Sequence, residues 1–151
     1  MNVFRIGDNR FPLFDGTGAR LHGGRWNSPG RTVIYAAQTY AGAVLEMLVH
    51  ANLNRLPRTH AVLTIHIPND LPVERHSPSE LPGWNGTDQS VSRAFGDRWL
   101  AETRSAVLLI PSFVTQGRES NCLLNPAHPD FARIEPSAPE PIVWDERLLL
   151  R

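Results

Sequence analysis

The sequence predicts an α+β fold, a single domain in which a mixed β-sheet core carries few helices. The chain has 151 residues, the size of one ordinary domain, and 41% of them are apolar, which is enough for one core. Segments that resemble strands outnumber those with helical periodicity. The 13 prolines exceed the ~5% that is usual in proteins and indicate long irregular connections. We therefore expect one domain over residues 1–151.

The first part of the chain is predicted to hold two short strands separated by a long loop. Residues 3–6 form the first strand, and residues 32–37 have the β-branched and aromatic content of the second. Residues 7–30 are rich in glycine and are predicted to be a loop; long loops in compact domains are usually functional.

A helix is predicted to follow Thr39, whose side chain can cap it. One face of this helix is mostly apolar and holds Ala41, Val44, Leu45, Leu48 and Asn52. Glu46 lies on the neighbouring face with Gly42, Ala43 and His50. The small residues one turn before Glu46 leave room for another molecule to reach it.

The second part of the chain continues with strands, one loop and one helix. Residues 60–67 alternate, with Ala61, Leu63, Ile65 and Ile67 on one side, and residues 68–87 are predicted to be a second long loop. Residues 90–102 form a helix whose periodic positions are Val91, Ala94, Phe95, Arg98 and Trp99. Residues 106–110 form a buried strand, and further short strands are predicted at 121–124, 132–135 and 142–144.

Composition excludes several classes of protein. Fifteen basic residues balance 15 acidic ones, which argues against direct nucleic-acid binding. Cys122 is the only cysteine, so an internal disulfide and a thiolate zinc cluster are excluded. No segment has the apolar length of a signal peptide or a membrane span, and we expect a cytoplasmic protein.

Common catalytic motifs are also missing. Gly16 and Gly18 do not continue into a dinucleotide-binding fingerprint, and without lysine the chain has no P-loop. Ser112 stands between Pro111 and Phe113 instead of the glycines of a serine-hydrolase elbow, so we expect a hydrogen-bond donor and not a nucleophile. The scattered histidines support no metal site.

Three polar residues occupy unusual places. Arg25 follows two glycines, where backbone can approach a ligand closely, and its forked guanidinium suits phosphate. Glu46 lies in an otherwise apolar helix, where a carboxylate is costly unless it is paired or used. Ser112 ends an apolar strand. Structural roles remain open for these three residues and for Tyr35: an Arg25–Glu46 ion pair, a solvated Glu46, a backbone cap at Ser112, and simple core packing for Tyr35.

The segments around these residues resemble the RES domain, a family named for its Arg, Glu and Ser. The resemblance lies in residues 21–30, 41–50 and 108–113, and continues through 121–131 to 144–148. Arg25, Glu46 and Ser112 match the three naming residues, and Tyr35 matches an aromatic residue of the family's active site. Other recurring positions, which we expect to be scaffold, are matched by Trp26, Asn27, Asn121, Asn125 and His128.

The resemblance implies a bacterial toxin with an ADP-ribosyltransferase-like fold that consumes NAD⁺ by hydrolysis, phosphorolysis or ADP-ribosyl transfer. By this resemblance, Glu46 is expected to stabilise the positive charge that develops on the ribose, and Arg25 to bind the pyrophosphate. Tyr35 is expected to pack against nicotinamide or its ribose, and Ser112 to orient the nucleotide. NAD⁺ is then the substrate, and no metal or further cofactor is expected.

The expected partner is an Xre-type helix-turn-helix antitoxin, with a homodimer inside the toxin–antitoxin complex left open. Alternatives are a mono-ADP-ribosyltransferase that modifies a cellular protein, and a non-enzymatic binding module built on a buried Arg25–Glu46 pair. An RNA-cleaving toxin is a further alternative, against which the zero net charge counts.

Overall fold

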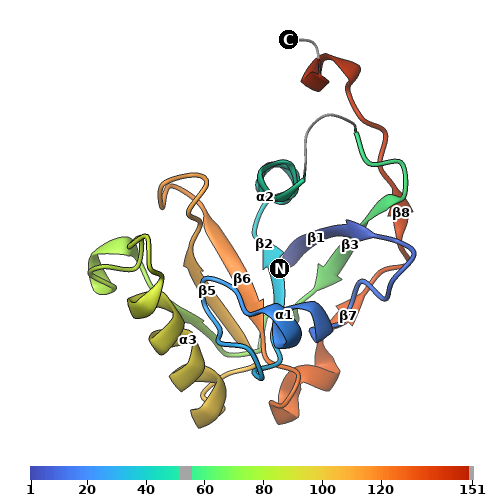
Figure 1. Cartoon of the computed structure of the whole chain (residues 1–151). Helices are drawn as coiled ribbons and strands as arrows, with labels where there is room; N and C mark the ends of the chain where they lie inside the picture. Colours follow the sequence, from blue (N-terminus) through green and yellow to red (C-terminus); the bar gives the residue numbers. More distant parts are fainter. Residues whose placement is uncertain (52–55, 150–151) are drawn as a thin grey trace.

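The computed structural model describes residues 1–51 and 56–149, and its fold confirms the predicted α+β class (Figure 1). Within these residues a mixed sheet has the strand order β4-β5-β6-β2-β1-β3-β7, with β8 also paired to β3. All pairs are antiparallel except β4 with β5. The strands are β1 (Asn2–Asp8), β2 (Ile34–Ala37), β3 (His60–His66), β4 (Val73–Arg75), β5 (Val107–Pro111), β6 (Ser120–Leu124), β7 (Glu135–Pro136) and β8 (Glu140–Pro141).

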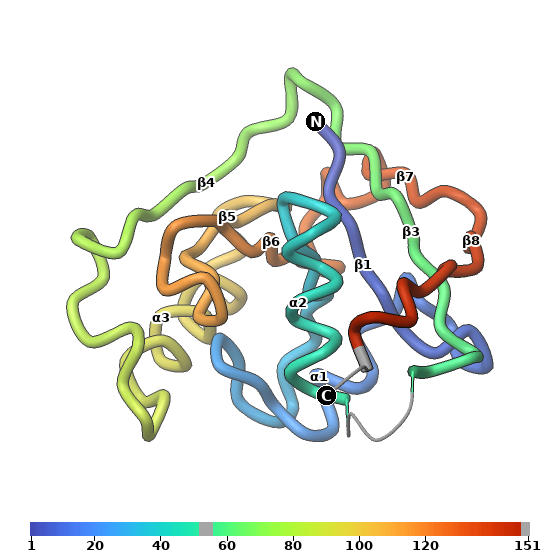
Figure 2. Tube along the Cα trace, turned by 90° about the horizontal axis from the view of Figure 1, so that it is seen from above, coloured from blue at the N-terminus to red at the C-terminus, as the bar shows by residue number. Residues whose placement is uncertain are grey.

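In the described part of the chain, three α-helices accompany the sheet: α1 (Thr17–His22), α2 (Tyr40–His50) and α3 (Ser90–Glu102). Short 3₁₀ turns cover Pro78–Glu80, Pro129–Arg133 and Glu146–Leu149. Seen from above, α2 runs over the centre of the sheet near β1 and β2, while α3 lies to the side of β5 (Figure 2). Among the described residues, no helix combines the length and apolar character that crossing a membrane requires.

Two apolar cores lie on opposite faces of the sheet. Strand alternation sends Val107 and Leu109 of β5 into one core, and Leu108 and Ile110 into the other. The second core is closed by α3 through Trp99, which is fully buried and donates its indole N–H to Ser105 Oγ at 2.9 Å. Because the sheet is covered on both faces, every residue of β5 is buried, as expected for residues 106–110.

The predicted cap and helix after Thr39 are confirmed, but the predicted apolar face is not the buried one. The Thr39 hydroxyl accepts a hydrogen bond from Gly42 N at 2.9 Å. The buried positions of α2 are Gly42, Ala43 and Met47, whereas Leu45 is 39% exposed and Val49 is 60% exposed. Small side chains let this face of the helix approach the sheet closely, and so Glu46 is turned inward beside them. Asn52 lies outside the described residues.

The helix over 90–102 has the predicted bounds, with its buried face rotated from the expected one. Ser92, Gly96, Trp99 and Leu100 are buried, while Val91 is exposed. The reason is a close approach at Gly96, where an added Cβ would lie 1.8 Å from the carbonyl oxygen of Trp26. Only glycine fits there, so this side of α3 lies against the loop that carries Arg25.

The loops and the late strands differ from the prediction in detail. The loop at 7–30 contains α1, and the loop at 68–87 contains β4. Of the strand predicted at 132–135, Glu135 alone lies in a strand, β7, because Pro129 and the capping His128 start a 3₁₀ turn that runs to Arg133. The strand predicted at 142–144 is wrong, since pairing is confined to β8 just before it. By contrast, the alternation predicted for 60–67 is confirmed, with Ala61, Leu63, Ile65 and Ile67 all buried.

Candidate active site

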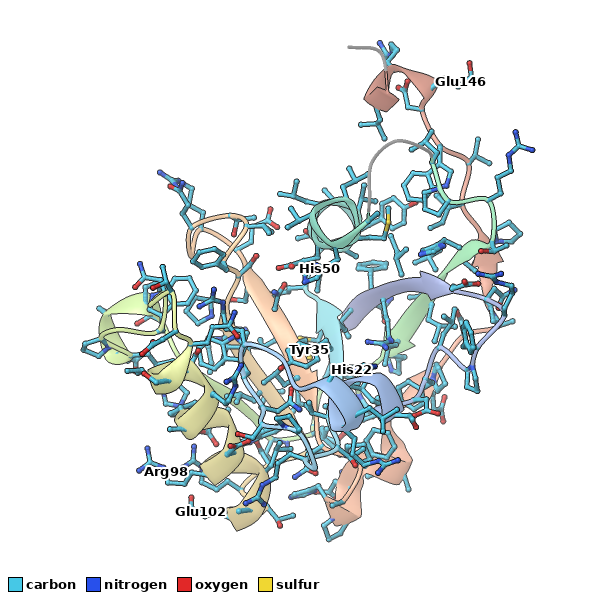
Figure 3. All side chains as sticks on the ribbon, in the orientation of Figure 1. His22, Tyr35, His50, Arg98, Glu102 and Glu146 are labelled. Atoms are coloured by element: carbon cyan, nitrogen blue, oxygen red, sulfur yellow. The ribbon has the colours of Figure 1, made fainter. Side chains whose placement is uncertain are left out.

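A cleft of about 690 Å³ opens between α2, the Gly-Gly-Arg loop and the turn after β5. Its lining includes three of the predicted site residues, Arg25, Tyr35 and Glu46, and also Asn121 and Phe113. Figure 3 shows Tyr35 in the middle of the molecule, between α2 above and α1 below, with His50 over it. The structure therefore brings the predicted residues to one place although they are far apart in the sequence.

The site lies where the apolar faces of β2, β5 and β6 end in polar side chains. On β5 and the residue after it, Ile110 and then Ser112 continue the face that enters the α3 core. On β6, Leu123 belongs to that core and Asn121 follows it towards the cleft. The same face of β2 carries Tyr35. At the end of the core, β2, β5 and β6 thus contribute Tyr35, Ser112 and Asn121, and Glu46 of α2 contacts the last two.

Glu46 is held by two donors that bond to the same oxygen. Asn121 Nδ2 donates to Glu46 Oε1 at 2.6 Å, and Ser112 Oγ donates to the same atom at 3.1 Å. No other described residue bonds to the Glu46 carboxylate, so Oε2 has no hydrogen-bond partner within 1–51 and 56–149. Ser112 is only 2% exposed. Its hydroxyl is therefore committed to the glutamate, in line with the expectation of a donor and not a nucleophile.

Arg25 is held across the cleft from Glu46 by backbone and by an aromatic ring. Its Nη1 donates to the carbonyl oxygens of Trp84 at 3.2 Å and Gly86 at 3.1 Å, and its guanidinium carbon lies 3.9 Å from the Phe113 ring centroid. Burial lowers the pKa of Arg25, and the nearby Glu46 charge opposes this. Both Nη1 hydrogens are used, while Nε and Nη2 bond to no described residue. The Nε–Nη2 edge can therefore donate two parallel hydrogen bonds to a phosphate group.

The described residues contain no Arg25–Glu46 ion pair at contact distance. The binding-module hypothesis, which needed these two groups to neutralise each other, therefore loses its structural basis. The two charges face one cleft separately, and a ligand that lies between them can use both.

Tyr35 forms one wall of the cleft and also supports the loop before it. Its hydroxyl donates to Asn27 Oδ1 at 2.7 Å and accepts from Trp26 N at 3.1 Å. Burial raises the pKa of Tyr35 far above its usual value, so the phenol stays neutral. An added Cβ at Gly24 would lie 2.7 Å from the Tyr35 hydroxyl, which explains the glycine before Arg25.

The Arg25 loop is fixed from two further sides. Asn27 is fully buried, and its amide donates to the backbone oxygens of Ala19 at 2.8 Å and Arg31 at 3.1 Å. From α3, Asp97 accepts from Ser28 N at 2.8 Å, and Arg93 donates to Gly24 O at 3.3 Å. Asn27 thus supports the loop, and Asn125 and His128 cap local turns, in keeping with the scaffold role expected of them. Trp26 was also expected to be scaffold, and it is buried but lines the cleft as well.

Sequence reasoning missed three residues of the site. Asn121 was expected to be scaffold but touches Glu46. Phe113 stacks on Arg25, and Arg5 of β1 lines the cleft while donating to Leu13 O at 2.6 Å and Tyr35 O at 2.7 Å. A signal existed for Asn121, a polar residue at the start of an apolar strand. Within the described residues, no group of three metal-binding side chains comes together.

Comparison with known proteins gives a consistent result. The RES domain family model matches residues 2–145. A Prs ADP-ribosylating toxin from Sphingobium is 38% identical over 138 residues, covering 89% of this chain and 85% of that protein. A protein named Toxin Res from Photorhabdus laumondii is 37% identical over 135 residues, covering 87% and 85%.

Among solved structures, the MbcT–MbcA toxin–antitoxin complex of M. tuberculosis contains a similar chain, with a TM-score of 0.73. The identity is 18%, with 94% of this chain and 84% of the other covered, so this likeness concerns the fold.

Proposed function

The chain belongs to the RES domain family, and from that premise we propose that it is the toxin of a toxin–antitoxin pair and cleaves the nicotinamide–ribose bond of NAD⁺. The observation that carries the proposal is the geometry of the Glu46 carboxylate, which lines the cleft. Its Oε1 accepts two hydrogen bonds, and its Oε2 has no hydrogen-bond partner among the described residues. Loss of NAD⁺ would then arrest growth of the host cell.

The chemistry suits a single carboxylate. Breaking the nicotinamide–ribose bond builds positive charge on the ribose, as glycoside hydrolysis does. Glycosidases need a second carboxyl group as the acid for their leaving group, but nicotinamide is already cationic in NAD⁺ and leaves neutral. Glu46 therefore only has to stabilise the developing cation, directly or through a ribose hydroxyl. Its two partners, Ser112 and Asn121, are neutral donors that leave its charge in place.

The other groups of the cleft are assigned to binding. The open Nε–Nη2 edge of Arg25 suits the pyrophosphate by forked hydrogen bonds. Tyr35, neutral and rigidly held, offers its ring to nicotinamide or the ribose. Ser112 was expected to orient the nucleotide; because its hydroxyl bonds to Glu46, we assign it to the carboxylate.

A second candidate is ADP-ribosyl transfer to a cellular protein. The name of the Sphingobium relative, an ADP-ribosylating toxin, favours it. Both reactions break the same bond at the same carboxylate and differ only in the acceptor, which is water or phosphate in one case and a protein side chain in the other.

The decisive experiment incubates the purified protein with labelled NAD⁺, in buffers with and without phosphate, and separately with a cell extract. Free ADP-ribose indicates hydrolysis, its 1-phosphate indicates phosphorolysis, and labelled protein indicates transfer. The Glu46→Gln variant is the control for contaminating activities. If NAD⁺ survives and no protein is labelled in any arm, the proposal is wrong.

We further propose that a separate antitoxin of the Xre helix-turn-helix type silences this chain by covering the cleft. One solved structure with a similar fold is that of a toxin–antitoxin complex. The loops at 7–30 and 68–87 border the cleft through Arg25 and the residues that hold it, and they are the proposed contact surface.

A further inference from the structure

We infer that Asn121 is a positioning residue that sets which oxygen of Glu46 faces the substrate, an inference that rests on the proposed cleavage of NAD⁺. The inference rests on two hydrogen bonds that Glu46 Oε1 accepts, from Asn121 Nδ2 at 2.6 Å and from Ser112 Oγ at 3.1 Å. Oε1 is occupied by protein donors, and Oε2 is the oxygen left for the developing cation.

The backbone of Asn121 is unusually well fixed for a residue at a cleft. It pairs with Ala37 of β2 on one side and with Ile110 of β5 on the other, so it lies inside the sheet and not at an edge. Its short side chain has few rotamers, and a hydrogen bond to a carboxylate is about twice as strong as a neutral one. Asn121 can therefore hold the end of the longer and more flexible Glu46 side chain.

Asparagine is a suitable residue for orienting the Glu46 carboxylate. An amide donates a hydrogen bond without carrying charge, so it orients the carboxylate and leaves its negative charge available. A carboxylate at position 121 would have no proton to donate and would repel Glu46. A lysine or arginine would neutralise Glu46 and remove the electrostatic stabilisation that the reaction requires.

If the role of Asn121 were purely structural, its hydrogen bond to Glu46 would serve only to hold α2 against β6. A second hydrogen bond also joins these two elements. Thr39 Oγ1 donates to Glu119 Oε2 at 2.9 Å and joins the start of α2 to the residue before β6. Glu119 lies two positions before Asn121, so both side chains leave the same face of the strand. This contact does not touch the Glu46 carboxylate, and Glu119→Ala is therefore a matched control.

The first test compares the steady-state kinetics of NAD⁺ cleavage in N121A, N121D and E119A with their melting temperatures. We expect kcat of N121A to fall about 10- to 100-fold with KM nearly unchanged, because the carboxylate is misplaced while the binding groups stay. N121D, though of equal size, should be at least as impaired as N121A. E119A should keep its kcat, and its loss of thermal stability should not exceed that of N121A because Glu119 is exposed.

Two kinetic outcomes would overturn the inference. If N121D matches wild type, the donor at position 121 is not needed. If E119A loses as much kcat as N121A, Asn121 acts only by fastening α2 to β6.

The second test does not depend on activity. In an NMR spectrum, the side-chain amide pair that disappears in N121A belongs to Asn121, and its bond to a carboxylate should shift one proton downfield. In the Glu46→Ala variant that proton should return to the ordinary range. If wild type leaves NAD⁺ intact but shows this response, the proposed function fails and the Asn121–Glu46 contact stands. If the amide proton ignores Glu46→Ala, the contact is absent and the inference falls whatever the enzyme does.

Discussion

At the scale of single residues, the site separates charges instead of pairing them. Among residues 1–51 and 56–149, Glu46 accepts hydrogen bonds from neutral donors alone, and Arg25 is held by carbonyl oxygens and the face of Phe113. Each therefore has polar atoms without a hydrogen-bond partner among the described residues, and both residues line one cleft. Such an arrangement costs stability unless a ligand uses it, which is why we interpret it as functional.

The Glu46→Gln variant should lose NAD⁺ cleavage by about 10²–10³-fold while remaining folded. Glutamine keeps the size of the side chain and can still accept from Ser112 and Asn121, but it lacks the charge opposite the developing cation. NAD⁺ consumption measures the loss, and circular dichroism checks the fold. A folded variant with the wild-type rate would show that Glu46 is structural.

Arg25 should bind NAD⁺ through geometry as well as charge. Arg25→Ala should weaken binding most, and Arg25→Lys should restore only part of it, because lysine supplies neither the fork nor the flat stack on Phe113. Titration calorimetry in the Glu46→Gln background measures binding without turnover. Equal affinity of the lysine variant and the arginine parent would exclude forked binding.

At the scale of elements, α3 (Ser90–Glu102) contributes no residue to the lining of the cleft but fixes the loop that does. The helix holds the Arg25 loop through Asp97, Arg93 and the close approach of Gly96. α2 in turn places Glu46 because Gly42 and Ala43 let it lie close to the sheet. Both helices are thus positioned by small residues, and the cleft opens beside α2.

Gly96→Ala should lower stability and raise KM for NAD⁺ together. A Cβ at this position would lie 1.8 Å from Trp26 O, so the helix and the Arg25 loop must move apart. Overpacking of this kind typically costs about 1–3 kcal/mol. Thermal melts and steady-state kinetics measure both effects.

Ala94→Gly on the exposed side of α3 is the control for Gly96→Ala. It weakens the helix by about 1 kcal/mol without a clash, so its KM should stay at the wild-type value. If Gly96→Ala also leaves KM unchanged, α3 does not position the Arg25 loop.

At the scale of the whole molecule, one sheet serves two cores and one site. The core on the face away from α3 is closed by loops and turns and contains Cys122, while the core under α3 ends at the polar residues of the cleft. The proposed antitoxin would control this toxin by covering the cleft. We therefore expect the physiological control to be the partner and not a change within the sheet.

Expression of the chain alone should stop bacterial growth and deplete NAD⁺, because the cleft is then uncovered. Co-expression with the neighbouring antitoxin gene should restore both, and the Glu46→Gln variant should be harmless without it. Growth curves and NAD⁺ assays on the same cultures provide the measurement. Normal growth of cells that make the active, folded protein alone would contradict the proposal.

Cys122 should report global unfolding. Its thiol is fully buried on β6 between β2 and β5, and burial raises its pKa. At pH 8 it should therefore resist a thiol reagent until denaturant unfolds the sheet. Rapid labelling of the native protein would show that the central strands open locally.

Local sequence was sufficient to predict the α+β class, the bounds of the helix at 90–102, the alternation of 60–67 and the unusual setting of Glu46 in an apolar helix. These depend on local periodicity, capping and composition, which neighbouring residues encode. The buried faces of α2 and α3, the place of Asn121 beside Glu46 and the separation of Arg25 from Glu46 became visible in the folded chain alone. The bonds that hold Glu46 join residues 66 and 75 positions apart in the chain. Such contacts follow from how close small residues allow the helices to approach the sheet, and periodicity alone does not contain that distance.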